Sequence, residues 1–246
     1  MVPHIIDGHI HLHEYKHDEI REICRRKDLL LLAVSDDLNS SRKTLELGQE
    51  CPNVFAAVGL HPWEVGDVEN VNPILSKFTN MVKDPLTRAV GEVGLDKKFV
   101  PQTYEKQVLV FRFFASLAAE TGKPLSIHAA GAWREVLEVL DELGVRKAVI
   151  HWFTGPLDLL EEIASHGYYI GVNAALKIQR KMREVVKAAP LEIMITESDG
   201  PYNYRGLRLG PHMIPEVIKF IAEAKGVDEV EVRRVIHRNF MSLFTS

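Results

Sequence analysis

The segment Asp7-Gly8-His9-Ile10-His11 directly follows a short, mainly apolar stretch, residues 2–6. In an extended strand, successive side chains point to opposite faces, so His9 and His11 share one face and Ile10 takes the other. Two imidazoles on one face can share a divalent cation, although a lone pair of this kind also occurs at strand ends by chance. The segment therefore predicts a strand that ends in a metal site, provided that the rest of the chain supplies further ligands.

Apolar runs alternate with amphipathic stretches from this strand to the end of the chain. Residues 29–35, for example, form the continuous apolar run typical of a strand buried on both faces. Strands are expected at residues 2–6, 29–35, 54–59, 87–93, 125–128, 147–151, 168–172 and 192–196, and helices at 18–27, 40–49, 73–82, 102–121, 133–143, 157–165, 180–188, 214–225 and 228–244. Eight strands, each followed by a helix, predict an α/β fold of the (β/α)8 TIM-barrel type, with an open doubly wound sheet as the alternative. One domain is expected to span residues 1–246.

The composition is that of a globular protein, with 46% hydrophobic residues and a mean hydropathy of −0.06. No apolar run reaches the roughly 18–20 residues that span a bilayer, and no basic and apolar leader opens the chain, so we expect a cytoplasmic protein without a membrane partner. Cys24 and Cys51 form neither a CxxC pair nor a disulfide framework, and we expect structural thiols in a reducing compartment. The net charge of −4 argues against a long basic groove for duplex DNA but leaves room for a phosphate-bearing substrate held by bound cations.

Residues that bind metals recur where the predicted strands end. In a (β/α)8 barrel these ends meet at one rim, so side chains that are distant in sequence come together there. A single histidine after a strand is more often a loop or core residue, whereas Glu92, among glycine and apolar neighbours, is costly to bury unless a cation or a donor meets it. Six residues of suitable chemistry are more than one cation needs, and they predict two divalent metal ions. The six are His9, His11, Glu92, His128, His151 and Asp199.

Seven segments, in order along the chain, resemble the motifs of a known family: residues 7–11, 59–62, 89–96, 127–128, 151–155, 197–202 and 239–244. Together they resemble the TatD family of metal-dependent deoxyribonucleases, a branch of the amidohydrolase-like barrels. The resemblance implies a set of roles for the six ligand-type residues. One metal would be held by His9, His11 and Asp199, a second by His128 and His151, and Glu92 would bridge the two.

The identity of the metal can be argued in two ways. Four histidines favour zinc, manganese or another transition metal, since magnesium prefers oxygen ligands. The resemblance instead implies magnesium-dependent activity. Two cations close together would lower the pKa of a water between them, and we expect Asp199 to take the proton from that water as the general base. Glu92, as the implied bridge, is the second expected catalytic residue.

Three positions depart from the family pattern. The family usually has an arginine shortly after the fifth-strand histidine, whereas this chain has residues 129–132, all alanine or glycine, after His128. Trp152 stands where a small residue is usual, and Ser198 stands where threonine is usual. None of these departures removes an expected ligand. The missing arginine removes a phosphate or polar-substrate contact that the resemblance implies.

Substrate contacts are expected from loops on the same rim. His61 is expected to contact the substrate or a phosphate, with a loop histidine packed by Pro62 and Trp63 as the alternative. Aromatic and cationic residues after the fourth and eighth strands suit base stacking and phosphate contact, although a solvated surface loop has the same composition. These residues are Lys97, Lys98, Tyr202, Tyr204, Arg205 and Arg208.

The sequence as a whole favours a metal-dependent hydrolase resembling the TatD deoxyribonucleases, which would cleave phosphodiester bonds of DNA from single-stranded ends with metal-activated water. The alternative is a hydrolase of a non-nucleic substrate on the same dinuclear site, such as an aminoacyl-tRNA deacylase, an amidase or a lactonase, because one fold and one metal site host many reactions. A non-catalytic binding protein would be favoured by the loss of a ligand, and none is lost. The sequence indicates no protein partner.

Overall fold

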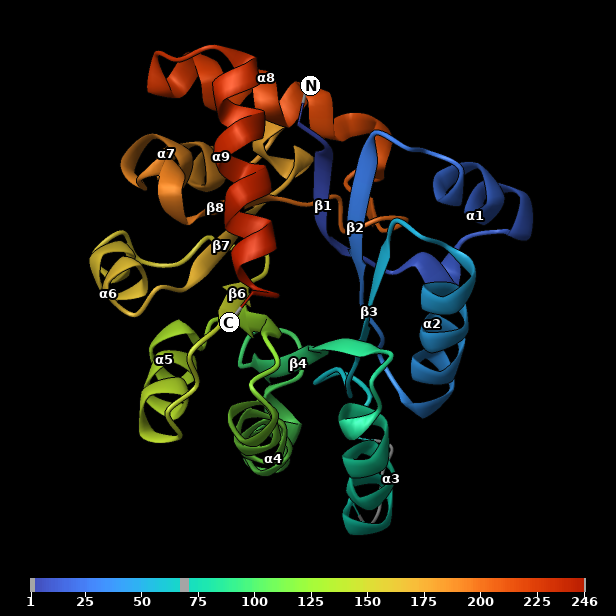
Figure 1. The fold of residues 1–246 in the computed structure, drawn as a ribbon. Helices are drawn as coiled ribbons and strands as arrows, with labels where there is room; N and C mark the ends of the chain where they lie inside the picture. The colour runs from blue at the N-terminus through green and yellow to red at the C-terminus, as the bar shows by residue number, and fades with distance from the viewer. Residues whose placement is uncertain (1–2, 67–70, 246) are drawn as a thin grey trace.

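The computed structural model describes residues 3–66 and 71–245, and Val2, which the first predicted strand includes, lies outside the described residues. Within these ranges eight parallel strands lie side by side in the order β1 to β8 and form the nearly closed barrel of Figure 1. The strands are β1 (Ile5–Ile10), β2 (Leu29–Ala33), β3 (Val54–Val58), β4 (Thr87–Asp96), β5 (Leu125–Ala130), β6 (Ala148–Ile150), β7 (Tyr169–Val172) and β8 (Met194–Thr196). The helices around them are α1 (His17–Cys24), α2 (Leu38–Glu50), α3 (Asn72–Lys83), α4 (Tyr104–Thr121), α5 (Trp133–Glu142), α6 (Leu159–Ser165), α7 (Arg180–Ala188), α8 (Ile214–Lys225) and α9 (Glu229–Ser242).

The (β/α)8 barrel predicted from the sequence is confirmed, and the chain does not form the open doubly wound sheet. The bounds differ most at β1, which covers Ile5–Ile10 where residues 2–6 were expected, and they also differ at β4 and β8. β4 continues to Asp96, three residues beyond its predicted end, because its last residues pair with β5 as far as Ala130. β8 begins only at Met194, since Leu191–Ile193 form a 3-10 turn after Pro190. Gly122 ends α4 in the left-handed conformation, as its position predicts.

A short hairpin that the sequence analysis does not predict follows β8. It consists of β9 (Asn203–Tyr204) and β10 (Leu207–Arg208), and Arg205 and Gly206 connect the two strands. Both connecting residues have positive φ, 49° and 86°, which is the backbone twist that a two-residue hairpin turn requires. Glycine at the second position is the sequence signal that could have located this turn.

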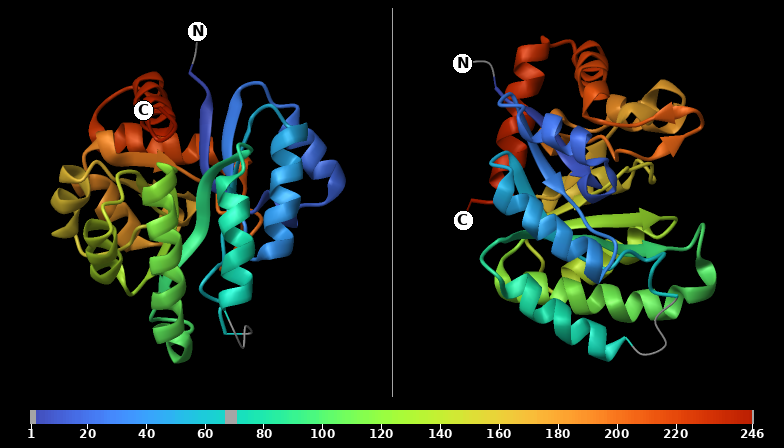
Figure 2. Two further views of the ribbon diagram at one scale, coloured as in Figure 1. Left: turned by 60° about the horizontal axis from the view of Figure 1, so that its bottom comes forward. Right: turned by 90° about the vertical axis from the view of Figure 1, so that its right-hand side faces the viewer.

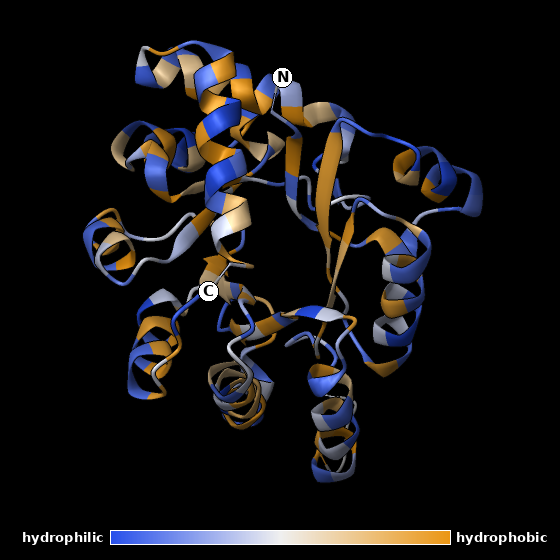
Figure 3. Ribbon diagram, in the orientation of Figure 1, coloured by the Kyte–Doolittle hydropathy of each residue, from blue (hydrophilic) through white to orange (hydrophobic). Residues whose placement is uncertain are grey.

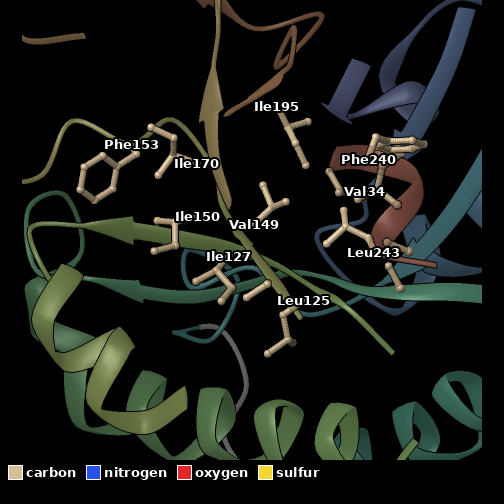
Figure 4. Packing of buried hydrophobic residues seen from close by; sticks show 14 of the residues in the cluster. Val34, Leu125, Ile127, Val149, Ile150, Phe153, Ile170, Ile195, Phe240 and Leu243 are labelled. Carbon is tan, nitrogen blue, oxygen red and sulfur yellow. The ribbon is translucent and has the colours of Figure 1, made fainter. Parts of the chain in front are cut away.

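The two ends of the barrel differ in what covers them. Figure 2 (right) shows both chain termini at one end and the orange β9–β10 hairpin at the other, toward which the strand arrowheads point. At the first end α9 packs against β1 and β8, and Phe240 of this helix and Leu243 directly after it are buried. Figure 4 shows these two side chains among the buried hydrophobic residues of the barrel. The end with the termini is therefore filled with apolar side chains, and the other end is free for polar loops.

The core follows from the apolar strands and from one apolar face on each helix. Figure 3 shows hydrophobic residues along the strands at the centre and hydrophilic residues on the outward faces of the helices. Each of the four consecutive strands β5 to β8 contributes one fully buried isoleucine, namely Ile127, Ile150, Ile170 and Ile195. Burial on both faces explains why the strands appear in the sequence as continuous apolar runs. No helix in the described part of the chain is long and apolar enough to cross a membrane.

The seam between β1 and β8, where the sheet closes on itself, is joined by a few specific bonds. The amide of His11 donates to the carbonyl of Gly200 (2.9 Å), and the amide of Asp199 donates to the carbonyl of His9 (2.9 Å). Gly8 allows this close approach, because a Cβ atom at this position would collide with the side chain of Ile195. The seam thus brings the two ends of the sheet together at the residues predicted to bind metal.

The two cysteines form a disulfide, so the prediction of free thiols is wrong. Cys24 is the last residue of α1 and Cys51 directly follows α2, and their Cα atoms are 5.1 Å apart. Packing of the two helices brings together residues that are 27 positions apart, and no spacing motif in the sequence indicates this. The reducing compartment inferred from free thiols loses its support.

Candidate metal centre

All six residues predicted as ligands lie at the carboxyl ends of the strands. His9 belongs to β1, Glu92 to β4 and His128 to β5, and the other three follow their strands in the next loop. Glu92 is 1% exposed and His9 is fully buried, so both are cut off from bulk water. A carboxylate and an imidazole at such depth require partners that satisfy their charge and hydrogen bonds. The six side chains supply these partners for one another.

Glu92 lies between two groups of histidines. Its Oε2 atom is 3.2 Å from Nε2 of His9 and 3.3 Å from Nε2 of His11. Its Oε1 atom is 3.0 Å from Nδ1 of His128 and 3.4 Å from Nε2 of His61. Each carboxylate oxygen therefore faces a different pair of imidazoles, which is the arrangement that a carboxylate shared by two cations requires.

Asp199 approaches the same cluster from the opposite side of the seam. Its Oδ1 atom is 3.5 Å from Nε2 of His11, 3.6 Å from Nε2 of His151 and 3.7 Å from Nε2 of His9. The φ angle of Asp199 is 55°, a left-handed conformation that aspartate tolerates better than most residues. The rings of His9 and His151 stack with centroids 3.7 Å apart. One carboxylate oxygen is thus within a short distance of three imidazole nitrogens.

The described residues contain four sets of ligand atoms that lie within 4.8 Å of one another. His151 groups with His9 and Glu92, whereas His128 groups with His61 and Glu92, so His128 and His151 do not share a set. The four sets are His9, His11 and Asp199; His9, Glu92 and His151; His61, Glu92 and His128; and His11, His13, Glu14 and Asp36.

The electrostatics of the cluster suit a cation. Burial raises the pKa of Glu92, but the nearby His61 and His9 outweigh burial and hold this pKa well below its ordinary value. Burial and the neighbouring His151 lower the pKa of His9, which favours the neutral form of its ring. Burial lowers the pKa of His151, but Glu197 and Asp199 reverse this and raise the pKa to about 9. In the absence of a cation, the ionised carboxylates therefore favour protonated imidazoles by raising their pKa. A divalent cation would supply the positive charge in place of those protons. The residues fit bound metal ions.

Each of the four predicted histidine ligands has an outer partner on its second ring nitrogen. Such a partner fixes the tautomer and points the other nitrogen into the cluster. The sequence analysis gave no role to any of these partners. The pairs are His9 Nδ1 with Ser126 Oγ (2.9 Å), His11 Nδ1 with Asp36 Oδ1 (3.0 Å), His128 Nε2 with Asp96 Oδ2 (2.9 Å), and His151 Nδ1 with Glu197 Oε1 (3.1 Å).

Glu197 has further hydrogen-bond partners of its own. It is fully buried, and its Oε1 atom accepts hydrogen bonds from the amide of Trp152 (2.8 Å) and from Nδ2 of Asn173 (3.0 Å). A side chain at Gly171 would collide with its carboxyl group, so this glycine makes room for it. Trp152 has a φ of 46°, and Gln179 holds its indole by accepting from Nε1 (2.9 Å). The left-handed backbone at Trp152, directly after His151, is thus held by the hydrogen bonds of the Trp152 amide and indole.

His61 presents an N–H group to the cluster. Its Nδ1 atom accepts a hydrogen bond from the amide of Trp63 (3.2 Å), so the proton of the neutral ring is on Nε2. Nε2 lies 3.3 Å from Nδ1 of His128 and points into the cavity over the cluster. This tautomer suits a hydrogen-bond donor to a substrate better than a metal ligand.

A cavity of about 700 Å³ opens above the cluster. The predicted substrate residues Tyr202, Tyr204 and Arg205 line it, but Lys97 does not, because its ammonium group pairs with Glu135. Lys98 lines the cavity in its place. Arg208, bound to Glu19 at 2.6 Å, does not line it either. The sequence does not indicate the other aromatic residues of the cavity, which are Trp63, Phe99, Trp133 and Trp152.

Comparisons with known proteins agree with this architecture. A family model described as TatD related DNase matches residues 6–245. A curated protein of Methanocaldococcus jannaschii, named as an uncharacterised metal-dependent hydrolase, is 27% identical over 97% of this chain and 96% of its own length. A protein of Bacillus subtilis with the same kind of name is 28% identical over 98% of both chains. The solved structure of a TatD homologue from Escherichia coli has a TM-score of 0.89 at 23% identity and covers 99% of both chains, which shows the fold.

Proposed function

Because the chain belongs to the TatD-related DNase family of metal-dependent hydrolases, we propose that it hydrolyses phosphodiester bonds of DNA from single-stranded ends. The observation that carries the proposal is a buried cluster of four histidines and two carboxylates on the floor of a cavity with aromatic walls. Residues 1–246 would act as one hydrolase domain. The two parts of the proposal, the metal centre and the substrate, rest on different observations.

The metal centre would hold two divalent ions, with Glu92 between them because its two oxygens face different imidazoles. When bound, such ions provide a hydroxide-like nucleophile at neutral pH and stabilise charge on the attacked phosphoryl group. The histidine-rich ligand set favours zinc or manganese, and the family resemblance adds magnesium as a candidate for turnover. By the family resemblance, His9, His11 and Asp199 would hold one ion and His128 and His151 the other, although the last two share no set of ligand atoms in the structure.

The protein side chains then have distinct tasks. Asp199 takes the proton from the attacking water, since its Oδ1 atom is at the centre of the cluster and its carboxyl is ionised. His61 donates a hydrogen bond from its Nε2–H group to a phosphate oxygen that enters the cavity. Ser126, Asp36, Asp96 and Glu197 act through the histidines that they orient.

The substrate part of the proposal rests on the cavity walls. Trp152 and Tyr204 lie edge to face with centroids 5.0 Å apart, and Tyr202 is 46% exposed beside them. Exposed rings of this kind stack on nucleobases without sequence preference, and Arg205 and Lys98 are placed to contact phosphates. The buried position of Glu92 and Asp199 requires the reacting phosphate to descend into the cavity, which a single strand can do and a duplex interior cannot.

A second candidate, a hydrolase of a non-nucleic substrate, is favoured by one observation. Ala129, Ala130 and Gly131 line the cavity where the family resemblance implies an arginine. This wall has no charge for a phosphate and leaves space for an acyl or lactone substrate. An aminoacyl-tRNA deacylase, an amidase or a lactonase would use the same metal centre.

A direct comparison of substrates separates the two candidates. Metal-loaded protein is incubated with end-labelled single strands, the matching blunt duplex, and an aminoacyl ester. We expect stepwise shortening of the single strand, slower attack on the duplex, and no reaction in Asp199→Asn. Tyr202→Ala with Tyr204→Ala should weaken oligonucleotide binding with unchanged metal content, and Leu109→Ala, exposed on α4, is the control. Survival of the single strand while the ester is cleaved would establish the second candidate.

A cytoplasmic location is also a proposal. The Cys24–Cys51 disulfide limits it, because disulfides persist inside cells mainly in hyperthermophiles. The state of the two cysteines in intact cells, measured by alkylation before and after reduction, decides whether the protein stays in a reducing compartment.

A further inference from the structure

A group of ligand-type side chains, of which the proposed function uses only Asp36, lies beside the cavity. His13 and Glu14 belong to the 3-10 turn Leu12–Glu14 that follows β1, and Asp36 follows β2. Their ligand atoms and those of His11 all lie within 4.8 Å of one another. Two strand ends that are neighbours in the barrel therefore bring one further imidazole and two further carboxylates together.

The ring of His13 is oriented by the backbone. Its Nδ1 atom is 3.2 Å from the carbonyl oxygen of Val34, and since a carbonyl oxygen can only accept, Nδ1 carries the proton and donates it. Donation from one ring nitrogen to a backbone carbonyl is the usual way in which a metal-binding histidine is fixed. The lone pair of the neutral ring is then on Nε2.

Nε2 of His13 points at a carboxylate. It lies 3.0 Å from Oδ2 of Asp36, so two acceptors face each other and a positive charge is required between them. A metal ion satisfies this geometry, because two ligand atoms about 2.1 Å from one ion are separated by about 3.0–3.4 Å. A proton on Nε2 is the other way to satisfy it.

Asp36 has one oxygen available for this role. Its Oδ1 atom is 3.0 Å from Nδ1 of His11, whose Nε2 faces Glu92 and Asp199 in the main cluster. Oδ1 therefore faces His11 at ion-pair distance, and Oδ2 faces His13. Glu14, which lines the cavity and is exposed, makes no ion pair within the described residues.

We propose that Nε2 of His13, Oδ2 of Asp36 and the carboxylate of Glu14 bind a third divalent cation beside the proposed two-ion centre. One imidazole and two carboxylates are a ligand set for zinc, manganese or iron, and two negative charges balance the charge of the ion. Because Glu14 and Asp36 line the cavity, the open coordination positions face the substrate space. An ion there would contact a second phosphate of a bound strand, next to the one that reacts. The contact with a phosphate rests on the proposed function, whereas the binding of the ion does not depend on which ester the main centre hydrolyses.

Counting ions tests the proposal without any activity measurement. The protein is loaded with zinc, passed through a desalting column and examined by native mass spectrometry and elemental analysis. We expect one ion fewer per chain in His13→Gln and in Glu14→Gln than in the wild type. His17→Gln, an exposed histidine at the start of α1, is the matched control and should keep the wild-type number. Equal ion numbers in all four proteins would overturn the proposal.

Crystals of the loaded wild-type protein give a second measurement that no folding defect can obscure. Anomalous scattering at the zinc edge should show a peak about 2.0–2.1 Å from Nε2 of His13. If a proton joins His13 to Asp36 instead, peaks occur at the main cluster alone, and the third site does not exist. Failure of the main centre gives a different result, which is the loss of the peaks at Glu92 and Asp199.

Discussion

Glu92 keeps its charge although only 1% of its surface reaches solvent, because four imidazoles surround its two oxygens. Removal of this charge should therefore affect everything that the cluster binds. Glu92→Gln is expected to lower the content of both ions and the activity together, since glutamine cannot bridge two cations with negative oxygens. Asp199→Asn is expected to lower the rate by several orders of magnitude while the ion at His128 and His151 stays bound.

Elemental analysis and single-turnover rates on the same preparations check this prediction, with Glu105→Gln on the exposed face of α4 as the control. Full activity in Glu92→Gln would rule out its bridging role. Loss of all metal in Asp199→Asn would show that the two ions cannot be held separately.

Asp7 is a buried carboxyl group that is expected to make the stability depend on pH. Burial raises its pKa to about 7, although Ser198 and the amide of His9 donate to it, and its Oδ2 atom has no partner among the described residues. The folded state thus binds a proton between pH 4 and pH 7 that the unfolded state has already lost. Stability contributed by this group is complete below pH 4 and falls as the pH rises to 7.

Asp7→Asn should abolish this dependence. In metal-free protein the variant should be more stable than the wild type by a few kcal/mol at pH 8, because each pKa unit corresponds to about 1.4 kcal/mol, and equally stable near pH 4. Urea unfolding at several pH values measures the difference. If the variant were more stable by the same amount at every pH, the difference in stability would come from packing and not from ionisation of Asp7.

The residues of the site differ in how far the sequence reveals them. Glu92 and Asp199 could be selected because acids among glycine and apolar residues at strand ends need a cation or a donor. Asp36 also follows a strand, β2, but its neighbours are Ser35 and Asp37, so it lacks the apolar and glycine surroundings of Glu92. Ser126 and Glu197 carry no such signal, because each acts on a histidine from another strand and its role depends on register and packing.

At the scale of elements, the disulfide links the first two helices. Cross-linking 27 positions restricts the unfolded chain and should contribute about 3.5 kcal/mol by the loop-entropy relation. Cys24→Ser with Cys51→Ser is expected to lower the free energy of unfolding by about that amount. Dithiothreitol should lower the wild-type value to the same level and leave the double variant unchanged. A wild type that does not respond to complete reduction would contradict the prediction.

Elements with a strong periodicity were predicted well, and those fixed by local turn chemistry were not. The bounds of α7 and α8 agree with prediction because each helix has one apolar and one charged face. The β9–β10 hairpin has strands of two residues, too short for any period, and its only signal is Gly206. The cysteine pair shows the same limit, since contact between α1 and α2 depends on the barrel as a whole.

At the scale of the whole molecule, the closure of the barrel and the candidate metal centre involve the same residues. Alternation of eight apolar strands with amphipathic helices is enough to predict the barrel, because each strand must bury both faces. The sequence does not show that the seam between β1 and β8 runs through the metal centre. His9 and His11 stand on one side of this seam and Asp199 on the other, with the amides of His11 and Asp199 bonded across it. A cation held by these three residues would act as a further link between the first and last strands.

Removal of the metal should therefore loosen the seam before it loosens the rest of the barrel. With a chelator present, we expect hydrogen exchange at the amides of His11 and Asp199 to accelerate at least tenfold, which corresponds to about 1.4 kcal/mol of lost local stability. The amides of Val90 and Leu125, bonded to Pro124 and Lys147 at the opposite end of the barrel, should change much less. Exchange resolved by residue, in the loaded and chelated protein, measures both sets. If all four amides accelerate equally, the ions stabilise the fold globally and do not join the seam; if none does, these residues hold no ion.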